Sequence, residues 1–174
     1  YEKCGGCVCQ HMDYTLSLQM KKEKVQDALS RIGGLDIAVP MPLGMENPYH
    51  YRNKCALPVG EKDGALQIGF YAPRSHRIVD VEKCLISKEE SNAVLQTVRS
   101  WMEKFHIPAY NEATRKGLIR HVMSRVSKAG DVMAVLIAAA PSLPHSRELI
   151  AMLRAQLPGL KSVYLNVNKR SDNV

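Results

Sequence analysis

The sequence has no apolar run of the roughly eighteen residues that a membrane-spanning helix needs, so we expect no membrane segment. An export signal is also missing, because the first residues are polar and rich in cysteine rather than apolar. The chain does not begin with Met, and we expect it to be a fragment of a longer protein. Without export, a reducing cytoplasm is the expected location, where free thiols and metal ligands are commoner than disulfides.

Acidic residues are in the minority. Lys and Arg number 24 and Asp and Glu 17, which gives a formal net charge of +7. Such a surplus favours a polyanionic partner such as nucleic acid, although basicity alone does not establish one. Apolar residues make up 45% and charged residues 24% of the 174 positions, values of a folded globular chain with one core or two small ones.

Cysteines are few but unevenly placed, since three of the five lie in the opening stretch CGGCVC. Cys4 and Cys7 form a Cys-x-x-Cys pair, in which two thiolates can converge on one metal while the glycines let the backbone turn tightly. Zinc and [4Fe–4S] centres take four ligands, and Cys84 is the best distant candidate. Cys9 has a poor spacing, and Cys55 fits a buried apolar position better. Three ordinary thiols are the alternative.

Hydrophobic periodicity predicts helices and strands in mixed order. The expected helices are 14–32, 88–105 and 145–157, and the expected strands are 51–59, 65–71, 77–81, 117–127, 131–140 and 161–168. Asp63-Gly64 predicts a tight hairpin turn, and Ser87 with Glu90 has the spacing of a helix capping box. Because the order is not a strict βαβ alternation, we expect an α+β fold with antiparallel hairpins packed against helices.

Several motifs together resemble the SAM-dependent RNA uracil-5-methyltransferases, in particular those that modify bacterial 23S rRNA. The family's cluster motif is Cys-x5-Cys-Gly-Gly-Cys followed by Gln-His, and here Cys4 to Cys7 and Gln10-His11 match it. The segment HRIVDVEKCLI resembles the one with the distant ligand, Cys84. Further matches are YRNK, IGFYAPRSH, LIRHVMSR and VYLNVNKRSDNV, in the family's order.

The resemblance implies a [4Fe–4S] cluster held by Cys4, Cys7, Cys84 and a first cysteine that would precede this chain. It implies three parts: a cluster-binding segment, 1–13; a helix and Pro-rich insertion, 14–48; and a central α+β RNA-binding domain, 49–174. The family's TRAM domain and SAM-binding domain would lie outside the chain. S-adenosylmethionine is therefore expected in the parent protein only, and the fragment itself is expected to be inactive.

The resemblance further implies ribosomal RNA as partner and a monomeric full-length protein, and it disfavours the tRNA-specific branch, which generally lacks the cluster motif. The expected RNA-binding residues are Arg52, Lys54, Arg74, Arg77, Arg120 and Arg125. A non-enzymatic, metal-stapled nucleic-acid-binding module is the alternative. A plain structural α+β domain with incidental thiols is a third possibility.

Overall fold

The computed structural model describes residues 3–170, and they divide into two units. The smaller unit includes Cys7–Pro48, and the larger includes Lys3–Gly6 and the chain from Tyr49 onward. Among the described residues, none of the helices is long and apolar enough to cross a membrane.

The smaller unit is built on one helix and the segment that returns beside it. α1 (Tyr14–Asp27) runs directly into one π-helical turn, η1 (Ala28–Ile32). The Asp13 carboxylate caps α1 by accepting hydrogen bonds from the backbone N–H groups of Thr15 and Leu16. Gln26 holds the returning segment, because its amide donates to the carbonyl of Ile37 and accepts from the N–H of Val39, both at 2.8 Å.

The predicted apolar stripe of this helix is not buried. Val25 is 49% exposed and Ile32 is 87% exposed, and Ser17 is the only buried residue of α1. The predicted helix itself is present, and it ends as expected at Gly33 and Gly34, where Gly34 takes a left-handed φ of 62°.

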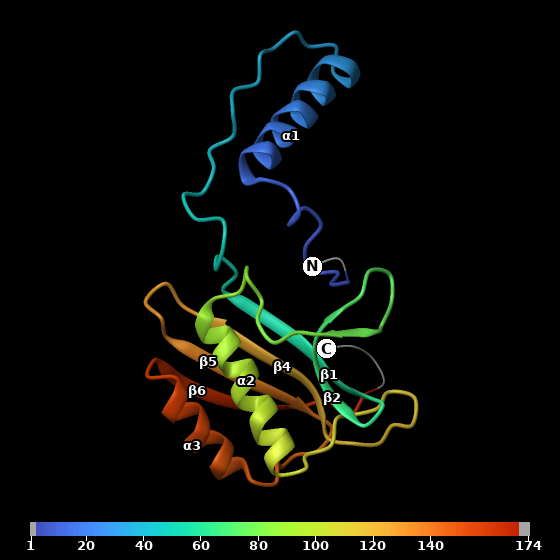
Figure 1. Ribbon diagram of the computed structural model, residues 1–174, viewed down its shortest axis with the longest axis vertical. Coiled ribbons are helices and arrows are strands. Elements are labelled where there is room, and N and C mark those ends of the chain that lie inside the picture. Colours follow the sequence, from blue (N-terminus) through green and yellow to red (C-terminus); the bar gives the residue numbers. More distant parts are fainter. Residues whose placement is uncertain (1–2, 171–174) are drawn as a thin grey trace. The chain divides into compact units, whose positions relative to one another are not determined.

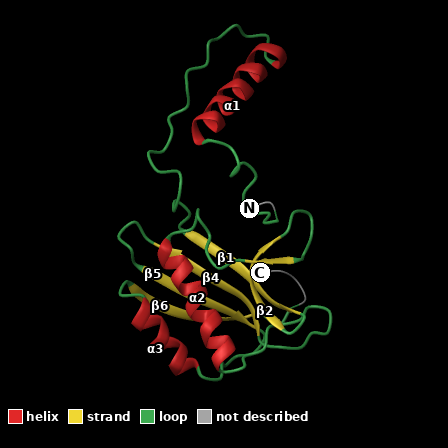
Figure 2. Cartoon of the chain, viewed as in Figure 1, coloured by secondary structure: helices red, strands yellow, loops and turns green. Residues whose placement is uncertain are grey.

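The larger unit contains a six-stranded mixed sheet with two helices on one face (Figures 1 and 2). Its strands are β1 (Lys54–Lys62), β2 (Ala65–Tyr71), β3 (Ile78–Asp80), β4 (Ile119–Val126), β5 (Val132–Ala138) and β6 (Leu160–Val167). The order across the sheet is β3-β2-β1-β4-β5-β6. All neighbouring strands are antiparallel except β5 and β6, which are parallel. The helix α2 (Glu89–Lys104) connects β3 to β4, and the helix α3 (Ser146–Gln156) connects β5 to β6. The predicted α+β class is confirmed.

The core lies between the sheet and these two helices. Leu57, Val122 and Leu136 are opposite one another on β1, β4 and β5 and are buried against apolar residues of α2 and α3. Trp101 of α2 is fully buried, and its indole N–H donates to the carbonyl of His145 at 2.9 Å. Because these side chains occupy the helix-covered face, the alternate residues of each strand point to the other face.

The hairpin β1–β2 turns where the sequence predicts. Asp63 and Gly64 have φ values of 52° and 78°, the positive values that a two-residue type I′ turn requires. The strand is shorter than expected at its other end, because β1 begins at Lys54 rather than at Tyr51, and Tyr51 is 52% exposed. Arg52 and Lys54 therefore do not share one strand; Arg52 forms an isolated parallel bridge with Ser87.

The predicted capping box at Ser87 is wrong. Lys88 is the N-cap of α2, and its side chain makes no capping hydrogen bond. The Ser87 hydroxyl instead donates to the buried sulfur of Cys55 at 3.5 Å. The Ser87 hydroxyl therefore bonds to a residue of β1 and not to the backbone N–H groups at the start of α2.

Candidate functional site

A pair of cations lies on the face of the sheet opposite α2 and α3. Lys54 of β1 is directly opposite Arg125 of β4, and both are exposed. Directly opposed residues of an antiparallel pair place their side chains on the same face, where like charges repel and destabilise the sheet. Within residues 3–170, neither side chain forms an ion pair with an acidic residue. The arrangement leaves two positive charges available to an anion.

Two more predicted residues lie in the connection between β2 and β3. Arg74 is exposed with a left-handed φ of 55°, and Arg77 is exposed and accepts a hydrogen bond from the N–H of Ala72 through its carbonyl. Neither guanidinium has an ion pair in the described part of the chain. Arg52 is half-buried. Its guanidinium already makes a cation–π contact, because it lies 5.6 Å from the centre of the Phe70 ring.

Arg120 differs from the other five predicted RNA-binding residues because its side chain is 0% exposed. It donates to Glu112 Oε1 at 2.8 Å and to the carbonyls of Asn168 and Arg170, and its guanidinium lies 4.8 Å from the centre of the Tyr110 ring. The register of β4 against β5 shifts between Ile119 and His121, so simple strand alternation does not hold at Arg120. These contacts give Arg120 a structural role.

The glycines of the cysteine motif allow a close approach to the sheet. The Gly5 N–H donates to the carbonyl of Tyr71 at 3.0 Å, and a Cβ at Gly5 would lie 2.6 Å from that oxygen. The Gly6 N–H in turn donates to the sulfur of Cys4 at 3.3 Å. The turn at Gly5 and Gly6 thus fixes the Cys4 sulfur against the backbone.

Cys84 is fixed by a residue that the sequence did not point out. Asn92 is buried in the first turn of α2. It accepts a hydrogen bond from the Cys84 N–H at 2.9 Å and donates one to the Cys84 carbonyl at 3.3 Å.

Cys55 is different, because burial raises the pKa of its thiol and outweighs the opposing hydrogen bond from Ser87. Cys55 is therefore a protonated core residue, as its strand position predicts.

The three predicted ligands are divided between the two units of the chain. Cys4 and Cys84 belong to the larger unit and Cys7 to the smaller. Among residues 3–170, no three His, Cys, Asp or Glu side chains are gathered in a group that could hold a metal ion. The thiols fit an iron–sulfur cluster in kind, and ligation by Cys4, Cys7 and Cys84 stays a prediction.

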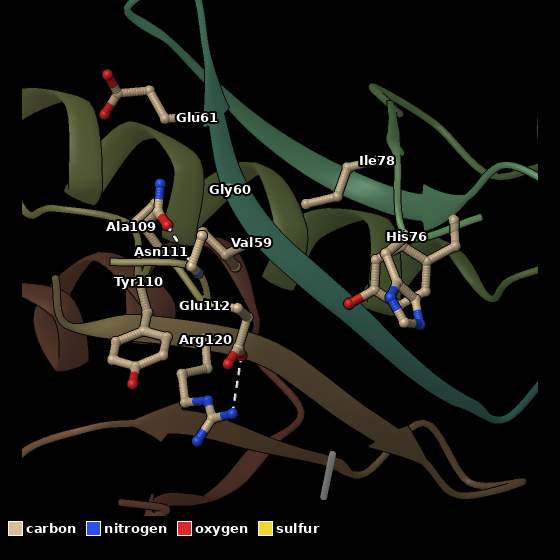
Figure 3. Close-up of a pocket in the computed structure, with 12 residues that line it drawn as sticks. Val59, Gly60, Glu61, His76, Ile78, Ala109, Tyr110, Asn111, Glu112 and Arg120 are labelled. Carbon is tan, nitrogen blue, oxygen red and sulfur yellow. Dashed lines mark hydrogen bonds and ion pairs between the residues drawn. The ribbon is translucent and has the colours of Figure 1, made fainter. Parts of the chain in front are cut away.

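A cavity of about 450 Å³ lies in the larger unit, close to Arg120 (Figure 3). Its walls include Tyr71, His76, Tyr110 and Glu112. These residues come from two segments far apart in the sequence, 71–76 and 110–112, and no local pattern predicts that they meet.

Known proteins similar to this chain are RNA methyltransferases. Over the whole chain it is 46% identical to an uncharacterized RNA methyltransferase of Clostridium tetani, 44% to one of Clostridium acetobutylicum and 44% to one of Bacillus cereus. The chain spans only 38%, 39% and 38% of those proteins. No protein-family model matches it.

A solved structure shows that the fold is shared. The tRNA (uracil-54, C5)-methyltransferase of Pyrococcus abyssi, solved in complex with S-adenosyl-L-homocysteine, superimposes with a TM-score of 0.71. The match covers 99% of this chain and 38% of that one, at 24% sequence identity. The chain is thus similar over its whole length to one part of RNA methyltransferases, and it shares the fold of the matching part of the Pyrococcus abyssi protein.

Proposed function

We propose that this chain is the central RNA-binding part of an RNA uracil-5-methyltransferase that acts on ribosomal RNA in the cytoplasm. The observation that supports RNA binding most strongly is the opposed pair Lys54 and Arg125, which costs the sheet stability unless an anion compensates it. Arg74 and Arg77 add two exposed cations on one loop. Relatives named RNA methyltransferases supply the activity of the whole protein.

The chain by itself contributes no catalytic step in this proposal. In the parent protein, S-adenosylmethionine would be held by a domain outside the chain, and the fragment alone would not methylate RNA. The role of residues 49–170 would be to hold the RNA strand by its phosphates, so that a target base can be presented elsewhere.

RNA binding can be tested by charge removal. Replacing both Lys54 and Arg125 by Ala should weaken binding to single-stranded RNA on the order of tenfold, since two exposed contacts at about 0.7 kcal/mol each sum to about 1.4 kcal/mol. Lys161→Ala is the matched control, because Lys161 is exposed but already lies 3.5 Å from the carboxylate of Asp131. Equal affinities of the double variant and the wild type would contradict the proposed role of the pair.

We further propose that Cys4, Cys7 and Cys84 are three ligands of a [4Fe–4S] cluster, with the fourth supplied from outside this chain. When bound, the cluster would tie the N-terminal segment to the domain. The hydrogen bond from Gly6 to the Cys4 sulfur and the two hydrogen bonds between Asn92 and the Cys84 backbone hold these two cysteines in defined positions. The proposal extends only to these three residues as ligands.

Cluster binding can be tested by reconstitution. A chain extended by the family's upstream cysteine, treated anaerobically with iron and sulfide, should turn brown and absorb near ~400 nm. Cys84→Ser should lower the iron content strongly, whereas Cys55→Ser should leave it unchanged. Equal iron loss in the two variants, or a colourless zinc-loaded product, would contradict the ligand set.

A further inference from the structure

The cavity near Arg120 has three aromatic rings in its lining. Tyr71 and His76 lie with ring centroids 5.3 Å apart, and Tyr110 comes from the segment that precedes β4. Figure 3 shows His76 and Ile78 on one side and Tyr110 and Glu112 on the other, with Val59 and Gly60 of β1 between them. At about 450 Å³ the cavity has the volume of a small-molecule site, and flat rings are surfaces on which a nucleobase can stack.

Two carboxylates line this cavity, those of Glu61 and Glu112, and Glu112 is the one held by an ion pair with Arg120. Glu112 Oε1 accepts from the buried guanidinium of Arg120, yet the Glu112 side chain is 52% exposed and keeps further acceptor capacity. The turn that carries it is fixed by Asn111, whose side-chain oxygen accepts from the N–H groups of Ala113 and Thr114 at 3.0 Å each. A pre-positioned carboxylate of this kind selects a ligand with donors on its edge.

The phenol of Tyr71 supports the same geometry. Its pKa is raised by burial first and by the negative charge of Glu112 second, while Arg120 opposes the rise. Both residues line the cavity, and the raised pKa leaves the Tyr71 phenol protonated and able to donate. Two cations, Arg74 and Arg77, flank His76 on its loop, where the phosphates of a bound strand would follow the base.

We infer that this cavity binds a guanine base of the RNA strand, an inference that rests on the proposed RNA-binding function. Guanine presents two adjacent donors, N1–H and the N2 amino group, which a carboxylate can accept as a pair. Uracil presents a single N3–H between two carbonyl oxygens, and both oxygens are repelled by the carboxylate. The cavity therefore favours guanine over uracil.

The RNA itself supplies the first test. The affinity of the chain is measured by fluorescence anisotropy for a short all-uridine RNA, for the same RNA with one central guanosine, and for the same RNA with one inosine. The guanosine RNA should bind at least about fivefold more tightly than the all-uridine RNA, the discrimination that one good base-edge contact gives. Inosine, which lacks the N2 amino group, should give an intermediate affinity.

A protein variant then assigns the preference to the cavity. Glu112→Gln should bring the ratio of guanosine to uridine affinities close to one. The two donors of guanine, N1–H and the N2 amino group, need two acceptor oxygens, and the glutamine amide has only one oxygen beside a donor NH2 group. Glu82→Gln is the matched control, an exposed acid outside the cavity whose loss should leave the ratio intact. A wild type that binds all three RNAs equally overturns the guanine site alone. A wild type that binds none of them overturns the proposed RNA-binding function as well.

Discussion

Replacing Arg120 by Ala should destabilise the larger unit strongly, because Arg120 is a fully buried cation with several partners. The change removes the hydrogen bonds to the carbonyls of Asn168 and Arg170, and a buried acceptor left unpaired costs about 1–3 kcal/mol. Loss of the guanidinium above Tyr110 adds roughly 0.5–2 kcal/mol. Glu112 adds little, since its half-exposed carboxylate returns to water.

The free energy of unfolding should therefore fall by about 3 kcal/mol or more, a large part of the roughly 5–15 kcal/mol that holds a typical domain folded. Urea unfolding followed by circular dichroism measures this difference. Arg125→Ala is the control, because an exposed side chain on the same strand should change stability by less than about 0.5 kcal/mol. A loss below about 1 kcal/mol for the Arg120 variant would refute the structural role of Arg120.

Two further predictions follow from buried titratable groups. Burial raises the pKa of the Cys55 thiol, so iodoacetamide at neutral pH should modify Cys4 and Cys9 well before Cys55. Mass spectrometry of the alkylated chain measures the order of modification. Early labelling of Cys55 would contradict its burial. Burial and the positive charge of Arg120 lower the pKa of His121, so the folded state binds fewer protons than the unfolded state as pH falls below about 6.5. Stability should decline in that range, and His121→Gln should flatten the decline; an unchanged pH profile would argue against the assigned environment.

Much of the larger unit could be predicted because its patterns are local. The stripe of Val94, Val98 and Trp101 has helical spacing and is buried on α2, and Asp63-Gly64 makes the expected turn. Ser87 shows the limit of such patterns: its spacing fits a capping box, yet a sulfur from a strand 32 residues away takes its hydroxyl. Local spacing cannot report a competing tertiary partner.

The candidate sites show the same limit. The exposure of Lys54 and Arg125 follows from alternation, but their direct opposition depends on the register of β1 against β4. Arg120 was expected on the surface, because a basic residue usually is. Its burial depends on Glu112 and on the chain near Asn168, 48 residues away, and no local pattern indicates either contact.

The salt dependence of RNA affinity tests the central claim most directly. If Lys54, Arg74, Arg77 and Arg125 each neutralise one phosphate, the logarithm of the association constant should fall against the logarithm of salt concentration with a slope of roughly −2.8, at about 0.7 for each contact with a single strand. The Lys54→Ala, Arg125→Ala double variant should lose about half of that slope. A wild-type affinity that does not change with salt would contradict RNA binding by this basic surface.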